Sequence, residues 1–255
     1  MDTVMKKELT VDEVIDMIVG IGYYIIKYGG EIYRAEDTAT RIGLAYGMDA
    51  VHVFAVSSTI LVTVEKDGVT KTENRRVTAT ATNLDRIEQL NSLSRKICNE
   101  KPSYQKVMQE LNRIEGRHCY SQGMVILFYA LIGASFAVFF GGGVAEFIAG
   151  FIIGALLRLV IWLLEYLKSA AFLINTVGAA LIVSATKVAT LAYPALNADA
   201  TITGVLMILV PGILLTNCIR DIVSTDYVAG TAKMIETLIV ACSIALGVAV
   251  SVLWR

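Results

Sequence analysis

The chain is poor in the residues that mark catalytic and metal-binding proteins. It has only two histidines, and its four cysteines form no CxxC pair or other metal-ligand spacing. No HExxH, GxSxG or Walker phosphate-binding motif occurs. We therefore predict no metal site and no cofactor. We interpret all four cysteines as reduced thiols: Cys98, Cys119, Cys218 and Cys242.

Charge is scarce in the second half of the sequence. Only 6 of the 22 Lys and Arg residues, and 6 of the 23 Asp and Glu residues, lie after residue 120. The net charge of −1 gives no nucleic-acid-binding signature. A hydrophobic content of 55% and a mean hydropathy of +0.62 favour a membrane protein. We predict a soluble α+β domain over residues 1–118 and an α-helical membrane domain over residues 119–255, with no cleavable signal peptide.

The predicted soluble domain begins with two helices. Thr10 and Glu13 form a capping-box pattern, and Gly29-Gly30 ends the helix that follows. A second helix runs from Glu31 to Gly47. Residues 50–56, 59–64 and 69–77 then read as three antiparallel strands, with a hairpin turn at 66–68. Asn83 and Ser103 begin two further helices.

Three charged residues of the second helix are candidates for a site: Glu31, Arg34 and Glu36. Ion pairs on a helix surface are one interpretation, and spacing alone favours it. A regulatory site, or the mouth of a conduit, is the other. His52 is interpreted as a satisfied histidine of the sheet rather than a ligand or a base.

The second half contains five apolar stretches, each near the ~20 residues that cross a bilayer. We expect transmembrane helices at about 122–140, 144–164, 170–190, 201–219 and 231–253. Lys and Arg in the short loops predict that residues 1–118 lie on the cytoplasmic side.

The fourth stretch is interrupted by Pro211-Gly212, which breaks or kinks a helix because proline supplies no N–H. After the break, Thr216, Asn217, Arg220 and Asp221 share one broad helical face. A substrate or coupling-ion site at a broken helix is one interpretation. An ordinary helix end at the aqueous interface is the other.

Other spans also carry polar side chains. Glu146, Gly150, Gly154 and Arg158 recur at steps of four. The full set of candidates in the membrane domain is Glu146, Arg158, Asn175, Pro211, Gly212, Asn217, Arg220, Asp221 and Glu236. Arginine suits bidentate carboxylate binding, and buried carboxylates can carry protons. The set would suit a small carboxylate-bearing solute with proton coupling.

Three segments together resemble the threonine/serine exporter (ThrE-like) family. They are the stretch 30–41 with Ala45-Tyr46-Gly47, the strand region 53–64, and Val210-Pro211-Gly212 followed by Asn217, Arg220, Asp221 and Gly230. The family's Pro-Gly, Asn and Asp match at Pro211, Gly212, Asn217 and Asp221, and its acidic helix matches at Glu31 and Glu36.

A chain of this length is similar to the larger, YjjP-like subunit of the split members of that family. The resemblance implies a small YjjB-like membrane partner subunit. It also implies export of threonine and serine or of succinate-like dicarboxylates, linked to the proton motive force.

We therefore expect a multi-pass subunit of a secondary transporter in the cell (inner) membrane, not an enzyme. A partner subunit or a homo-oligomer would complete the pathway. Two alternatives remain open. One is a membrane-anchored sensor or scaffold. The other is a hydrolase-like enzyme in the soluble domain, which would need His52 to pair with an acid and a nucleophile such as Asp49, Ser57 or Ser58.

Overall fold

The computed structural model describes residues 9–78, 81–117 and 120–253, so the interpretation of Cys119 lies outside the described residues. The chain forms two compact units. The first comprises residues up to Cys119 together with Asn217–Lys233, and the second comprises Tyr120–Thr216 and Met234–Arg255. The chain passes between the units within α9 (Gly212–Val223) and again within α10 (Tyr227–Leu253).

The first unit begins with the two predicted helices. In α1 (Val11–Lys27), the Thr10 hydroxyl accepts a hydrogen bond from the Glu13 amide at 3.2 Å. The Thr10 amide donates to the Glu13 carboxylate at 2.9 Å, which completes the capping box. The turn after α1 contains Gly29 at φ +77°, and α2 (Ile32–Ala45) follows. Both helices and the glycine turn are confirmed.

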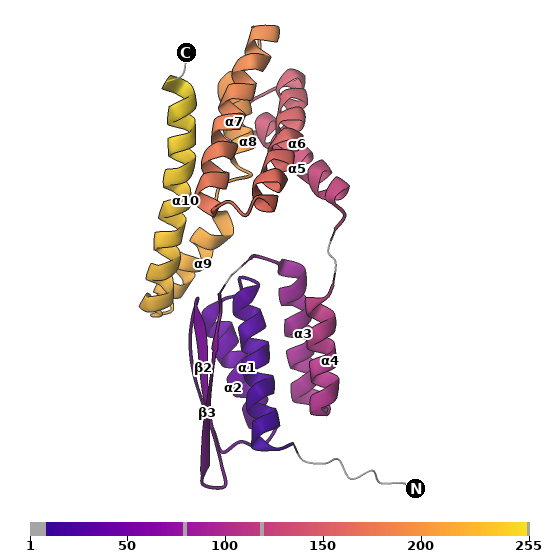
Figure 1. The fold of residues 1–255 in the computed structure, drawn as a ribbon, viewed down its shortest axis with the longest axis vertical. Helices are drawn as coiled ribbons and strands as arrows, with labels where there is room; N and C mark the ends of the chain where they lie inside the picture. Colours follow the sequence, from indigo (N-terminus) through magenta and orange to yellow (C-terminus); the bar gives the residue numbers. More distant parts are fainter. Residues whose placement is uncertain (1–8, 79–80, 118–119, 254–255) are drawn as a thin grey trace. The chain divides into compact units, whose positions relative to one another are not determined.

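Three antiparallel strands follow in the order β1 (Ala50–Val56), β2 (Thr59–Lys66) and β3 (Val69–Arg76). Asp67 and Gly68, at φ 51° and 75°, form the tight β2–β3 turn that the sequence predicts. Helices α1 and α2 cover one face of the sheet, where Ile60, Val62 and Val64 are fully buried (Figure 1).

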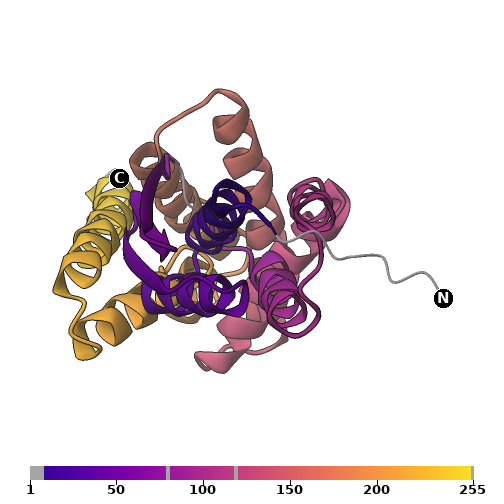
Figure 2. The same cartoon turned by 90° about the horizontal axis from the view of Figure 1, so that it is seen from below.

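Two further helices, α3 (Leu84–Glu100) and α4 (Tyr104–Glu115), pack against α1 and α2. The first unit thus has a sheet, a central pair of helices and an outer pair (Figure 2). The Asn83 side chain accepts from the Arg86 amide at 3.0 Å and caps α3. The segment 217–233 completes the unit, because Ala229 is wholly buried in its core.

The second unit contains α5 (Gln122–Phe139), α6 (Val144–Tyr166), α7 (Ala171–Ala192) and α8 (Ala198–Leu206), together with most of α10. Glycines allow close helix contacts. A Cβ on Gly150 would lie 2.7 Å from the Gly133 carbonyl oxygen, and one on Gly204 would lie 2.5 Å from Ala137 Cα.

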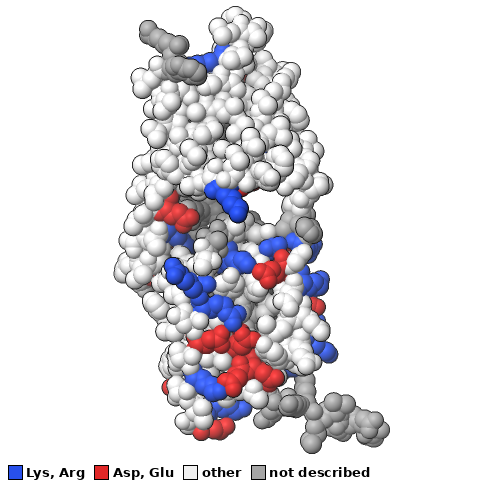
Figure 3. Space-filling model, viewed as in Figure 1, with Lys and Arg blue, Asp and Glu red and all other residues white. Residues whose placement is uncertain are grey.

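Four of the described helices are long and apolar enough to cross a membrane: α5, α6, α7 and α10. Large apolar side chains are exposed along them, and Figure 3 shows that Lys, Arg, Asp and Glu gather over the first unit. The predicted span 201–219 is not one helix. It is divided into α8, which ends at Leu206, and α9, which begins at Gly212 after Pro211. The predicted break is therefore confirmed, but a fifth continuous span is not.

Candidate functional site

The strongest grouping of candidate residues lies where α9 meets the turn between α1 and α2. We call Glu31, Arg34, Asn217 and Arg220 the α2–α9 cluster. The Glu31 carboxylate forms ion pairs with both arginines, at 2.5 Å from Arg34 Nε and through its other oxygen with Arg220 Nη1. Asn217 Nδ2 donates to the Gly29 carbonyl oxygen at 3.4 Å. Residues almost 190 positions apart in the sequence are thus brought into contact.

The glycine turn fixes the position of Glu31. Gly29 adopts the left-handed region at φ +77°, and a Cβ on Gly30 would lie only 2.6 Å from Ile25 Cγ2. Glu31 then stands at the N-cap of α2 without capping it through its side chain. The Glu31 side chain is 11% exposed, and its carboxylate is therefore available to the two guanidinium groups.

The next residue of α9, Asp221, forms a buried ion pair. Its carboxylate lies 2.6 Å from Lys233 Nζ on α10, and the two side chains are 1% and 8% exposed. Beside this pair, the Cys218 thiol donates to the Gly230 carbonyl oxygen at 3.3 Å. The sequence prediction did not include Lys233 among the candidate residues. The sequence signal that could have identified the pair is an acid, Asp221, and a base, Lys233, twelve residues apart on either side of a turn.

Glu36 lies on α2, five residues after Glu31, and is half-buried. Its Oε1 accepts a hydrogen bond from the Ala55 amide at 2.8 Å, so it ties α2 to β1. Burial raises the pKa of the Glu36 carboxyl, the Ala55 hydrogen bond opposes that change, and the negative charge of Asp226 adds to it. Glu36 therefore takes up a proton more readily than an ordinary glutamate does.

In the second unit, Glu146 has a structural role, because its carboxylate is hydrogen-bonded to the backbone. Its two oxygens accept hydrogen bonds from the backbone amides of Gly143 at 2.6 Å and Asn197 at 2.7 Å. The residue is 7% exposed. Glu146 therefore joins the loop before α6 to the loop before α8, and both oxygens are already engaged.

Arg158 follows Glu146 on α6 by twelve residues, a rise of about 18 Å. Its guanidinium lies 3.2 Å from Glu165 and 3.4 Å from the Gln122 side chain, and it stacks over the Tyr129 ring at 5.6 Å. The side chain is 11% exposed. The two residues therefore lie too far apart along α6 to form a common site.

Asn175 is half-buried on α7, and Glu236 is exposed on α10. Within the described residues, neither side chain forms a hydrogen bond or an ion pair. Pro211 and Gly212 form the break before α9. The structure thus brings Glu31, Arg34, Asn217 and Arg220 together, and it shows no hydrogen bond or ion pair that joins any two of the described residues Glu146, Arg158, Asn175 and Glu236.

His52 lies on the exposed face of β1, opposite Thr63 in the register. Asp49, one of the acids that a hydrolase site would use, instead accepts a hydrogen bond from the Asp67 amide at 2.9 Å. The structure shows no hydrogen bond from His52 to Asp49, Ser57 or Ser58, all of which it describes. The arrangement offers no activated nucleophile at this position.

Comparison with known proteins places the chain among exporters. The model of the putative threonine/serine exporter family matches residues 16–253. The probable succinate transporter subunit YjjP of Klebsiella aerogenes is 24% identical over 227 residues, which cover 88% of this chain and 87% of that protein. No solved structure matches. Because the family model covers nearly the whole sequence, the chain belongs to the threonine/serine exporter family and is a membrane protein of that family.

Proposed function

We propose that the chain is a subunit of a secondary transporter that exports small carboxylate-bearing metabolites, threonine and serine or a succinate-like dicarboxylate, with proton coupling. Its membership of an exporter family supports this proposal, as does the relative's description as a succinate transporter subunit.

The ion pair between Arg220 and Glu31 is the observation that carries the proposal. The Arg220 side chain is 45% exposed, whereas its partner Glu31 is 11% exposed and also paired with Arg34. A substrate carboxylate has the same chemistry as the Glu31 carboxylate and can replace it on the Arg220 guanidinium. Arg34 then retains Glu31. Asn217, three residues before Arg220, adds a side-chain amide on the same helical face.

Glu36 is the proposed proton carrier. Its pKa is raised by burial and by Asp226, and Asp226 lies in the turn between α9 and α10. Protonation of Glu36 removes the repulsion between the two carboxylates. The proton would therefore act on the same helical hairpin that carries Arg220.

We further propose a small YjjB-like membrane partner or a second copy of the chain, in the cell inner membrane, with residues 1–118 in the cytoplasm. The word subunit in the relative's description supports a partner.

Uptake into inverted membrane vesicles with an imposed proton gradient tests the proposal. Labelled succinate, threonine and serine would be offered to the chain alone and with its candidate partner. We expect Arg220→Gln to lower uptake by about tenfold or more, because a charge-assisted hydrogen bond contributes roughly 1.5–3 kcal/mol. Arg41→Gln is the matched control, since Arg41 lies on α2 and pairs with Asp37 at 2.9 Å in an exposed ion pair. Unchanged uptake by an inserted Arg220→Gln protein would exclude this role.

A further inference from the structure

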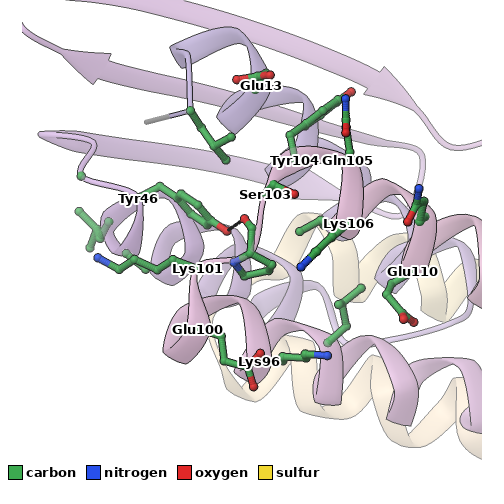
Figure 4. Close-up of a pocket in the computed structure, with 18 of the residues that line it drawn as sticks. Glu13, Tyr46, Lys96, Glu100, Lys101, Ser103, Tyr104, Gln105, Lys106 and Glu110 are labelled. Carbon is green, nitrogen blue, oxygen red and sulfur yellow. Dashed lines mark hydrogen bonds between the residues drawn. The ribbon is translucent and has the colours of Figure 1, made fainter. Parts of the chain in front are cut away.

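A second candidate site lies in the first unit, at the opposite end of α2 from the α2–α9 cluster. A cavity of about 1180 Å³ is bounded by the C-terminal end of α2, the connection between α3 and α4, and the first turn of α4 (Figure 4). Helix α2 has 14 residues, a length of about 21 Å, so the two sites are separate.

The cavity lining has an excess of positive charge. It includes four lysines, Lys66, Lys96, Lys101 and Lys106, and three glutamates. Among the described residues, no ion pair involves any of these lysines. Two of the glutamates are already engaged: Glu13 in the capping box with Thr10, and Glu110 with Arg113 at 2.7 Å. With four lysines against three glutamates, the lining carries a net charge of +1.

The lysines come from different elements. Lys96 on α3 and Lys106 on α4 lie on one side of the cavity, and Lys101 extends on the other (Figure 4). Each of them is exposed, so its ammonium group is hydrated and can exchange water for a ligand oxygen. Cations placed around a common space favour an anion with more than one charged group, because each group can meet a different lysine.

The connection between α3 and α4 has a defined shape. Lys101 adopts the left-handed region at φ 46°. The Tyr46 hydroxyl donates to the Pro102 carbonyl oxygen at 2.7 Å. Burial raises the pKa of Tyr46 to about 12. Tyr46 therefore holds in place the segment that carries Lys101.

The start of α4 adds hydrogen-bonding groups to the same lining. Ser103 is the N-cap residue of α4, yet its hydroxyl does not cap the helix. The first amides of a helix lack intrahelical partners and carry partial positive charge. Ser103, Tyr104 and Gln105 all line the cavity. The lysines are thus supplemented by a hydroxyl group and by backbone donors.

We propose that this cavity binds a small organic anion with two or more carboxylate or phosphate groups, held between Lys96, Lys101 and Lys106. The site is independent of the proposed transport site, because it uses none of the residues of the α2–α9 cluster.

Calorimetric titration of the full-length chain in lipid nanodiscs tests the proposal, with citrate, succinate and inorganic phosphate as probes. We expect saturable binding of at least one probe. The double variant Lys96→Gln/Lys106→Gln should weaken it by about tenfold or more, since two charge-assisted hydrogen bonds to the anion are lost. Stronger binding of citrate would identify a carboxylate ligand, and stronger binding of phosphate would identify a phosphorylated one.

Two controls separate this site from other effects. Arg95→Gln removes a neighbouring charge on α3 that is not part of the lining, and it should leave binding unchanged. Binding that Arg220→Gln removes and the double variant keeps would belong to the proposed transport site and not to this cavity, which separates the two proposals. The proposal is overturned if no probe shows saturable binding, if the double variant binds as the wild type does, or if Arg95→Gln weakens binding equally. Circular dichroism would verify that each variant is folded.

Discussion

The buried ion pair between Asp221 and Lys233 gives the sharpest prediction about stability. Asp221→Asn removes the negative charge but keeps nearly the same side-chain shape. Removal of one partner from a buried pair costs roughly 3–5 kcal/mol. The lower end, about 3 kcal/mol, applies here because asparagine keeps an acceptor oxygen and Lys233 has a further interaction. The lysine charge would then be 8% exposed without its carboxylate partner.

Hydrogen exchange measured by mass spectrometry on the chain in nanodiscs is the suitable assay, because it reports the opening of each segment separately. A loss of about 3 kcal/mol raises the opening equilibrium roughly 100-fold. We therefore expect amides of residues 217–233 to exchange about 100 times faster in Asp221→Asn, with smaller changes on α5 and α6.

Asp37→Asn is the matched control, because Asp37 and Arg41 form an ion pair whose side chains are 58% and 59% exposed. Asp37→Asn should change the free energy of opening by less than about 1 kcal/mol. The double variant Asp221→Leu/Lys233→Met should recover much of the protection, since no buried charge remains. Unchanged exchange in Asp221→Asn would refute the reasoning that the pair holds α9 to α10.

Three further predictions concern pH and packing. Since the pKa of Glu36 is raised in the folded state, the contribution of Glu36 to stability is present at low pH and is lost as pH rises through the raised pKa. Thermal unfolding between pH 4 and 8 should show that Glu36→Gln lacks this loss of stability. The pKa of Glu115 is lowered, mainly by hydrogen bonds from Lys27 and Tyr24, so the contribution of Glu115 to stability is present above its ordinary pKa and is lost as pH falls. Glu115→Gln should therefore reduce the loss of stability in acid, and an unchanged acid profile would contradict this. Gly204→Ala should lower the free energy of unfolding by about 1–3 kcal/mol, because the new Cβ would meet Ala137. Gly123→Ala, where a Cβ would have no atom within 4 Å, should be neutral or stabilising by up to about 1 kcal/mol. Equal free energies of unfolding for the two variants in chemical denaturation would argue against the close contact at Gly204.

Local signals in the sequence were sufficient to predict most elements of the first unit. The capping box at Thr10, the glycine turn at Gly29 and the Asp67-Gly68 hairpin each depend on residues within a few positions of one another. The break at Pro211 is equally local, because proline lacks the amide that a continuous helix needs. Such features require no knowledge of tertiary contacts.

The candidate site could be predicted only in part. Glu31 and Arg220 were both identified, but as members of two separate sets, and spacing favoured an ordinary surface role for Glu31. Their contact depends on how α9 docks on the α1–α2 turn, which no periodicity encodes. The fourth apolar stretch was counted as a span because its length and hydropathy are sufficient, although Pro211 divides it into α8 and α9. Glu146 was selected for its charge, but its backbone partners could be seen only in three dimensions.

The late segment that completes the first unit also sets an order of events during synthesis. Residues up to 117 leave the ribosome before any of 217–233 has been made, yet Ala229 fills part of their core and Arg220 pairs with Glu31. At about 5–20 residues per second, translation needs roughly 5–20 s to supply the missing part. During that interval the nascent first unit exposes an apolar docking surface and an incompletely paired carboxylate. Its final folding step therefore comes after synthesis of the apolar helices α5 to α7.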